Sequence, residues 1–109
     1  MNLARTSPPT VEEVRAAVSS VCEKYPIARM QIFGSLASGR THEGSDVDLL
    51  VEFLPGAPVG LLEMGGLKED LEQQLGCGVD LLSRAAVERS HNPYRRHSIL
   101  ASALTVYAR

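Results

Sequence analysis

Two aspartates two positions apart, Asp46 and Asp48, open an apolar stretch that is typical of a β-strand. Because alternate side chains of a strand point to the same face, both carboxylates should project together. Like charges this close repel each other unless a cation lies between them. Hard oxygen ligands favour Mg²⁺ or Mn²⁺, and Mg²⁺ completes its shell with water and substrate phosphates. The pair therefore predicts a divalent-metal site with a phosphate nearby.

Gly34 and Ser35 follow an earlier apolar stretch and offer a place for that phosphate. A glycine at the end of a strand lets backbone amides approach a ligand closely. Ser35 is expected to cap a short helix over residues 36–38. Exposed amides at a helix start, together with a hydroxyl, favour the terminal phosphate of a nucleoside triphosphate. We therefore expect the metal on one strand to face the phosphate on the other.

A third carboxylate, Asp80, lies in a short β-prone stretch, residues 78–83, among apolar neighbours. A charge in such a stretch is costly unless it is paired or bound to a metal. If this strand lies beside that of Asp46 and Asp48, the three carboxylates converge. Such a set suits two divalent ions about 3.5–4 Å apart, which stabilise the attacking and leaving oxygens of a displacement at phosphorus.

Each motif has a simpler explanation when it stands alone. The Gly34-Ser35 pair fits an ordinary strand-to-helix turn, and the other carboxylates fit a solvated strand entry or a helix cap. Alternative phosphate and metal motifs are absent: there is no Gly-x-x-x-x-Gly-Lys-Ser/Thr loop, and apolar residues follow Asp48 where an EF-hand needs oxygen ligands. The histidines and cysteines lack zinc-ligand spacing. The joint occurrence of the motifs favours a metal-nucleotide site.

The elements that must position these residues alternate between helical and strand patterns. We expect a flexible N-terminal arm over residues 1–9 and a single domain over residues 10–109. Thr10 and Glu13 have the spacing of a capping box before an amphipathic helix that ends near Tyr25. Strands are expected at residues 28–33, 46–53 and 78–83, and residues 105–107 either add a final edge strand or fray. Further helices are expected at 61–75, at 84–89 with Ser83 as its cap, and at 93–103 with Asn92 as its cap. Gly65 and Gly66 interrupt one helical pattern, which indicates either a later helix start or a close approach of the backbone to a ligand or partner.

The composition limits the classes of function. A chain of 109 residues with 44% hydrophobic content suits one compact domain. The formal charge of −2 lacks the basic footprint of a nucleic-acid binder, so nucleic acid is not an expected partner. No apolar run has membrane-spanning length. The two cysteines form no recognisable disulfide framework, so a cytoplasmic location is expected.

Together, Gly34-Ser35, the run from Ser45 to Leu49, and Asp80 resemble the polymerase-beta-type nucleotidyltransferase superfamily. Within it, the chain resembles the minimal nucleotidyltransferases, over about residues 11–107. The resemblance implies an α/β fold in which helices pack on a small mixed β-sheet. It also implies that Asp46, Asp48 and Asp80 are catalytic and hold Mg²⁺, as two ions, or Mn²⁺.

The resemblance further implies that Gly34, Ser35, Arg40 and Ser45 bind ATP. The expected reaction moves AMP to a tyrosine of a cognate HEPN-domain toxin, so that the chain acts as an antitoxin and forms a hetero-oligomer with that toxin. Two alternatives stay open, namely neutralisation by binding alone and nucleotidyl transfer to a small molecule. Many family members carry a basic residue soon after the Gly-Ser pair, which this chain lacks. Arg40, Lys68 or an arginine of the last helix would have to compensate.

Overall fold

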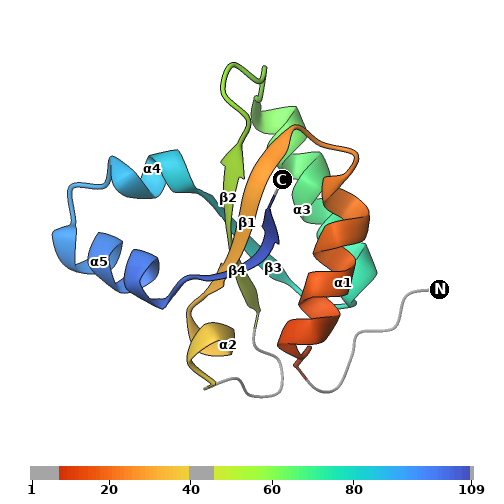
Figure 1. Ribbon diagram of the computed structural model, residues 1–109, viewed down its shortest axis with the longest axis horizontal. Coiled ribbons are helices and arrows are strands. Elements are labelled where there is room, and N and C mark those ends of the chain that lie inside the picture. Colours follow the sequence, from red (N-terminus) through yellow and green to blue (C-terminus); the bar gives the residue numbers. More distant parts are fainter. Residues whose placement is uncertain (1–7, 40–45, 109) are drawn as a thin grey trace.

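The computed structural model describes residues 8–39 and 46–108 and contains five helices and four strands within them (Figure 1). The elements follow each other in the order α1 (Val11–Cys22), β1 (Ile27–Phe33), α2 (Ser35–Ser38), β2 (Val47–Phe53), α3 (Leu61–Leu75), β3 (Val79–Ser83), α4 (Arg84–Glu88), α5 (Pro93–Ser102) and β4 (Leu104–Ala108).

The strands form one mixed sheet in the order β3-β2-β1-β4. β1 pairs antiparallel with both β2 and β4, whereas β2 and β3 are parallel and are connected through α3. The expected small mixed sheet with packed helices is therefore confirmed. The parallel register places Asp48 of β2 opposite Asp80 of β3, and the antiparallel register places Phe33 at the end of β1 opposite Asp48.

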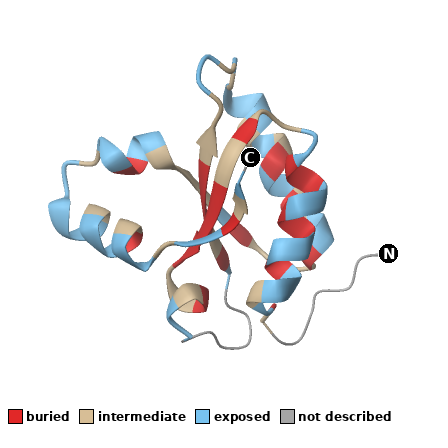
Figure 2. Ribbon diagram, in the orientation of Figure 1, coloured by how far each residue is buried: buried red, intermediate tan, exposed pale blue. Residues whose placement is uncertain are grey.

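One face of the sheet is covered by α1 and α3, and the main hydrophobic core lies between them and the strands (Figures 1 and 2). Val47, Leu49 and Val51 of β2 point into this core and are each at most 1% exposed. α1 begins with the expected capping box, in which the Thr10 hydroxyl accepts from the Glu13 amide and the Glu13 carboxylate accepts from the Thr10 amide. This face therefore contains most of the buried apolar side chains of the domain.

The opposite face is covered in part by α4 and α5, which lie side by side away from α1 and α3 (Figure 1). A second, smaller core there joins Phe33 and Leu50 of the sheet to Val87 of α4 and Ile99 of α5. Gln31 of β1 is the buried polar residue among those described. Asp48 and Asp80 belong to this face, because they alternate along their strands with residues of the main core.

The first helix ends at Cys22, three residues before the expected Tyr25, because residues 23–26 form turns. The other expected elements are found within one or two residues of their predicted bounds, with Ser83 and Asn92 as the caps of α4 and α5. The later start of α3 was a wrong expectation, because the helix begins at Leu61 and contains both glycines. A Cβ on Gly66 would lie 3.2 Å from the Tyr25 hydroxyl, so the backbone there does pass close to another part of the chain.

Two further findings concern the surface. The described end of the predicted arm is not fully exposed, since Pro9 is buried. Leu61 and Leu62, which belong to the apolar pattern of α3, are 92% and 89% exposed because the main core begins only at the second turn of that helix. Within the described ranges, every helix is too short or too polar to cross a bilayer.

Candidate active site

The first feature of the site is the approach of the two strands that carry the aspartates. Asp48 is the second residue of β2 and Asp80 the second residue of β3, and their Cα atoms are register partners. Asp46 lies just before β2, where the Val47 amide donates to the Gly78 carbonyl at 3.0 Å and so continues the parallel ladder. The sheet thus brings the three predicted carboxylates to one end of two neighbouring strands.

The surroundings of Asp48 affect the pKa of its carboxyl group. Its pKa is raised from the ordinary value, first by burial and then by the negative charges of Asp80 and Asp46. A cation between the side chains would relieve this repulsion. Asp48 is half-buried, whereas Asp46 and Asp80 are exposed and reachable from outside.

The donor set fits a hard divalent cation in its chemistry, because all three side chains offer carboxylate oxygens. In residues 8–39 and 46–108, however, no three acidic, histidine or cysteine side chains lie close enough together to hold a metal ion by themselves. Mg²⁺ does not require such a cage, since it usually keeps several waters and binds one or two carboxylates together with substrate phosphates. An ion of this kind at the three carboxylates would therefore need water and substrate phosphates to complete its shell.

Two glycines let the aspartate side chains lie close to the backbone. Gly34 has φ 72° and ψ −143°, a conformation that is almost restricted to glycine. A Cβ at Gly34 would also collide with the Asp48 carboxylate, and a Cβ at Gly78 would lie 2.5 Å from Asp46 Oδ1. Sequence reasoning identified Gly34 but missed Gly78, although its position directly before the Asp80 strand was a usable signal.

The predicted role of Ser35 as a helix cap is wrong. Gly34 occupies the N-cap position of α2, and Ser35 is the first residue of the helix, where its carbonyl accepts from the Ser38 hydroxyl at 3.2 Å. Among the described residues, no hydrogen bond uses the Ser35 hydroxyl.

The remaining residues that were expected to contact the nucleotide differ in where they lie. Arg40 and Ser45 lie outside the described residues. Lys68 is an exposed residue of α3, which covers the other face of the sheet, so it is not placed to compensate for the missing basic residue. Arg95 and Arg96 belong to α5, which packs on the same face of the sheet as Asp48 and Asp80.

A polar contact that sequence reasoning missed ties α4 to the sheet on the same face. The Arg84 guanidinium donates to Gln31 Oε1 at 2.8 Å, and Gln31 Nε2 donates to the Thr105 hydroxyl at 3.3 Å. A buried polar side chain needs such partners. The signal in the sequence was a glutamine within an otherwise apolar strand.

The sequence is similar to those of known nucleotidyltransferases. A sequence profile of the family described as "Nucleotidyltransferase domain" matches residues 14–106. A relative from Thermococcus cleftensis, named protein adenylyltransferase MntA, is 33% identical over 85 residues, which cover 72% of this chain and 82% of the relative. A relative from Methanocaldococcus jannaschii, provisionally named a protein adenylyltransferase, is 38% identical over 77 residues, which cover 71% of this chain and 74% of the relative.

Solved structures share the fold. One, provisionally described as a minimal nucleotidyltransferase, is 36% identical with a TM-score of 0.68 and covers 88% of this chain and 95% of its own. A second, described as a toxin-antitoxin with AMP-PNP, is 18% identical with a TM-score of 0.68 and covers 87% of this chain and 73% of its own. A third comes from a complex of a tri-AMPylated Shewanella oneidensis HEPN toxin with its MNT antitoxin, at 14% identity and a TM-score of 0.62, covering 92% of this chain and 74% of its own.

Proposed function

Because this chain belongs to the nucleotidyltransferase domain family, we propose that it transfers AMP from ATP to a tyrosine hydroxyl of a cognate HEPN-type toxin in the cytoplasm. The names of the Thermococcus and Methanocaldococcus relatives support a protein acceptor. The toxin-antitoxin complexes among the structures of the same fold support a toxin as that acceptor and a hetero-oligomer as the working form.

The observation that carries the proposal is the pairing of β2 with β3. It sets Asp48 opposite Asp80, and both Asp80 and Asp46 are close enough to raise the pKa of Asp48. Carboxylates that repel each other at an accessible sheet end are the expected state of a cation site before its cation arrives. Without a bound cation, this repulsion only disfavours the charged form of Asp48.

In the proposed reaction, Asp46, Asp48 and Asp80 hold Mg²⁺ or Mn²⁺. When bound, the cation neutralises charge on the phosphates and orients them for an in-line displacement. The β2 ladder fixes the backbone of Asp48, and the absence of a side chain on Gly34 leaves space for its carboxylate.

Asp80 has a second proposed role, since it is exposed where a protein acceptor can reach it. Its carboxylate would accept the proton of the attacking hydroxyl, and the oxygen so activated forms the new bond to the α-phosphorus as pyrophosphate leaves. The Gly34 backbone and the Ser35 hydroxyl, with Arg40 and Ser45, would bind the triphosphate.

The direct test is incubation of the chain with ATP, Mg²⁺ and the protein encoded by the neighbouring gene. We expect the partner's intact mass to increase by whole adenylate units, with the modified residue identified as tyrosine by fragmentation. No mass increase on the partner together with one on a small-molecule hydroxyl compound would overturn the protein-acceptor proposal.

A second experiment separates catalysis from neutralisation by binding alone. Asp48→Asn keeps the size of the side chain but removes its charge, so adenylylation should fall at least about a hundredfold. We expect this variant to lose neutralisation of the toxin in a growth assay while it still co-purifies with the toxin. Full neutralisation by Asp48→Asn would favour a binding antitoxin instead.

A further inference from the structure

The helices α4 and α5 carry a charge opposite to that of the rest of the chain. We call residues 84–102 the basic lobe. It contains four arginines and a single carboxylate, Glu88, so its formal charge is +3 in a chain whose total charge is −2. Such a segregation of charge favours a partner surface of opposite sign on this side of the molecule.

The arginines of the lobe differ in how far they are committed within the chain. Arg84 lies 3.9 Å from Glu88 and donates to Gln31, and Arg96 donates to the Ser90 carbonyl at 3.3 Å. Arg89 and Arg95 are exposed, and neither forms an ion pair with a carboxylate in the described part of the chain. These two guanidinium groups are free to bind an external anion.

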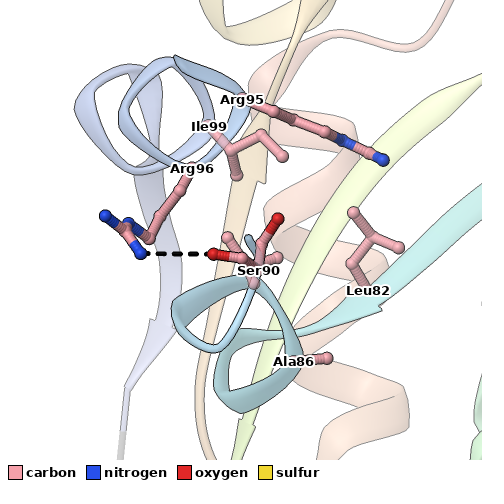
Figure 3. A pocket seen from close by; sticks show the side chains of 7 residues that line it. Leu82, Ala86, Ser90, Arg95, Arg96 and Ile99 are labelled. Carbon is pink, nitrogen blue, oxygen red and sulfur yellow. Dashed lines mark hydrogen bonds between the residues drawn. The ribbon is translucent and has the colours of Figure 1, made fainter. Parts of the chain in front are cut away.

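A pocket of about 180 Å³ lies between α4 and α5 and has Arg95 in its wall (Figure 3). Leu82, Val87 and Ile99 provide its apolar lining. Arg95 and Arg96 belong to its wall, and Figure 3 shows Arg96 turned to Ser90 while Arg95 extends in another direction. An apolar cavity with a cationic rim suits an apolar side chain that is flanked by carboxylates.

The pocket is close to the proposed reaction site. Leu82 follows Asp80 by two residues on the same face of β3, which corresponds to about 7 Å along the strand. Gly34 and Ser35 lie on the other side of β2 from Asp80, where the end of β1 meets the start of β2. A segment that occupied the pocket would therefore reach Asp80 along β3.

We propose that the basic lobe is the docking surface for an acidic segment of the protein acceptor, which seats an apolar side chain in this pocket and presents its hydroxyl to Asp80. The inference rests on the proposed function for the identity of the acceptor. The arginines also offset the repulsion that Asp46, Asp48 and Asp80 exert on an acidic segment, which would otherwise be kept away from the site.

Binding can be measured without any transfer step. The probe is a labelled peptide with a central tyrosine and leucine between glutamates, and its counterpart carries lysines in place of the glutamates. We expect the acidic peptide to bind more tightly and to shift the NMR signals of Leu82, Val87 and Ile99. We expect AMP-PNP with Mg²⁺ to shift Gly34, Ser35 and Asp48 instead.

The test variant is Arg89→Glu with Arg95→Glu, and the matched control is Arg15→Glu with Lys24→Glu, which makes the same charge change at exposed positions of or near α1. The dissociation constant of the acidic peptide should rise about tenfold in the test variant and less than about twofold in the control. Equal losses in both variants, or no preference for the acidic peptide, would overturn the docking surface. So would shifts of Leu82 and Ile99 by the nucleotide rather than the peptide.

The two proposals fail in different ways. If the acidic peptide binds the lobe but the wild type adenylylates no protein, the proposed function is wrong and the docking surface stands. If the wild type adenylylates its partner and the lobe variant does so with an unchanged KM, the docking surface is wrong and the proposed function stands.

Discussion

The two faces of the sheet are formed by alternate residues of the same strands, yet they differ in chemistry. On the face under α1 and α3, Val47, Leu49 and Val51 of β2 pack into a continuous apolar core. On the other face, the same strand presents Asp48 and then Leu50, and the smaller core under α4 and α5 begins only at Leu50. Figure 2 shows how much more of α1 is buried than of α4 and α5.

This difference shows how a chain of 109 residues can maintain both a stable fold and repelling charges. The apolar face supplies the burial energy, which scales with the apolar area removed from water. The polar end of the other face can then hold three carboxylates, where burial and then the charges of Asp80 and Asp46 raise the pKa of Asp48. Substitutions on the two faces should therefore affect different quantities.

The largest effect on stability is expected on the apolar face. Leu49 is fully buried in the main core, so Leu49→Ala should lower the free energy of unfolding by about 2–5 kcal/mol. Urea denaturation followed by circular dichroism measures it. AMP transfer per folded molecule should change little, because the Leu49 side chain points away from the aspartates. A loss smaller than that of an exposed alanine substitution would contradict the assigned core.

Gly34→Ala should affect both stability and activity, because Gly34 has a backbone conformation that disfavours alanine and lies against Asp48. Its backbone conformation is unfavourable for alanine and costs about 1–3 kcal/mol. The new methyl group would also displace the Asp48 carboxylate. Thermal unfolding and the rate of AMP transfer should both fall, whereas Gly65→Ala, at a helical glycine with open space around it, should be neutral or stabilising.

Tyr25→Phe is expected to have a smaller effect, on the apolar side of the molecule. The Tyr25 hydroxyl donates to Asp70 of α3 at 2.7 Å, and this bond, with burial, raises the pKa of Tyr25 to about 12 from 10.0. Loss of the bond should cost about 1 kcal/mol at pH 8. Because the folded-state pKa is raised, the contribution is complete below pH 10 and disappears as the pH rises toward 12. Denaturation at pH 8 and 11 should show the two proteins converging.

Asp48→Asn should have the smallest effect on stability and the opposite sign. The raised pKa of Asp48 means that folding disfavours its charged form, so the asparagine variant should be slightly more stable at pH 7, by less than about 1 kcal/mol. The difference should vanish as the pH falls and Asp48 becomes protonated. A clear destabilisation at pH 7 would show that the Asp48 charge is favourably bound within the chain itself.

Much of the fold could be predicted from the sequence because local patterns determine it. The capping box at Thr10, the serine cap before α4 and the asparagine cap before α5 are all found as expected. The exposed Leu61 and Leu62 could not be predicted, because periodicity identifies a helical stripe but not how far the sheet extends beneath it.

The sequence raised the possibility that the strand of Asp80 lies beside that of Asp46 and Asp48, and β2 and β3 do pair in this way. The details around these residues could not be predicted. The Gly34 cap in place of the expected Ser35 cap depends on a backbone conformation that the sequence does not specify. The pocket of the basic lobe required the structure, because only the packing of α4 and α5 on one face places Arg95 and Arg96 in the wall of a cavity with residues of α4.

The central claim is that the carboxylates at the ends of β2 and β3 bind a divalent cation together with a nucleotide. Titration of Mn²⁺ in the presence of AMP-PNP, followed by electron paramagnetic resonance, tests it without knowledge of the acceptor. The control is Glu69→Gln, which removes one carboxylate from the exposed surface of α3. We predict wild-type affinity in Glu69→Gln and affinity at least about tenfold lower in Asp48→Asn. Equal Mn²⁺ affinity in the three proteins would contradict the account.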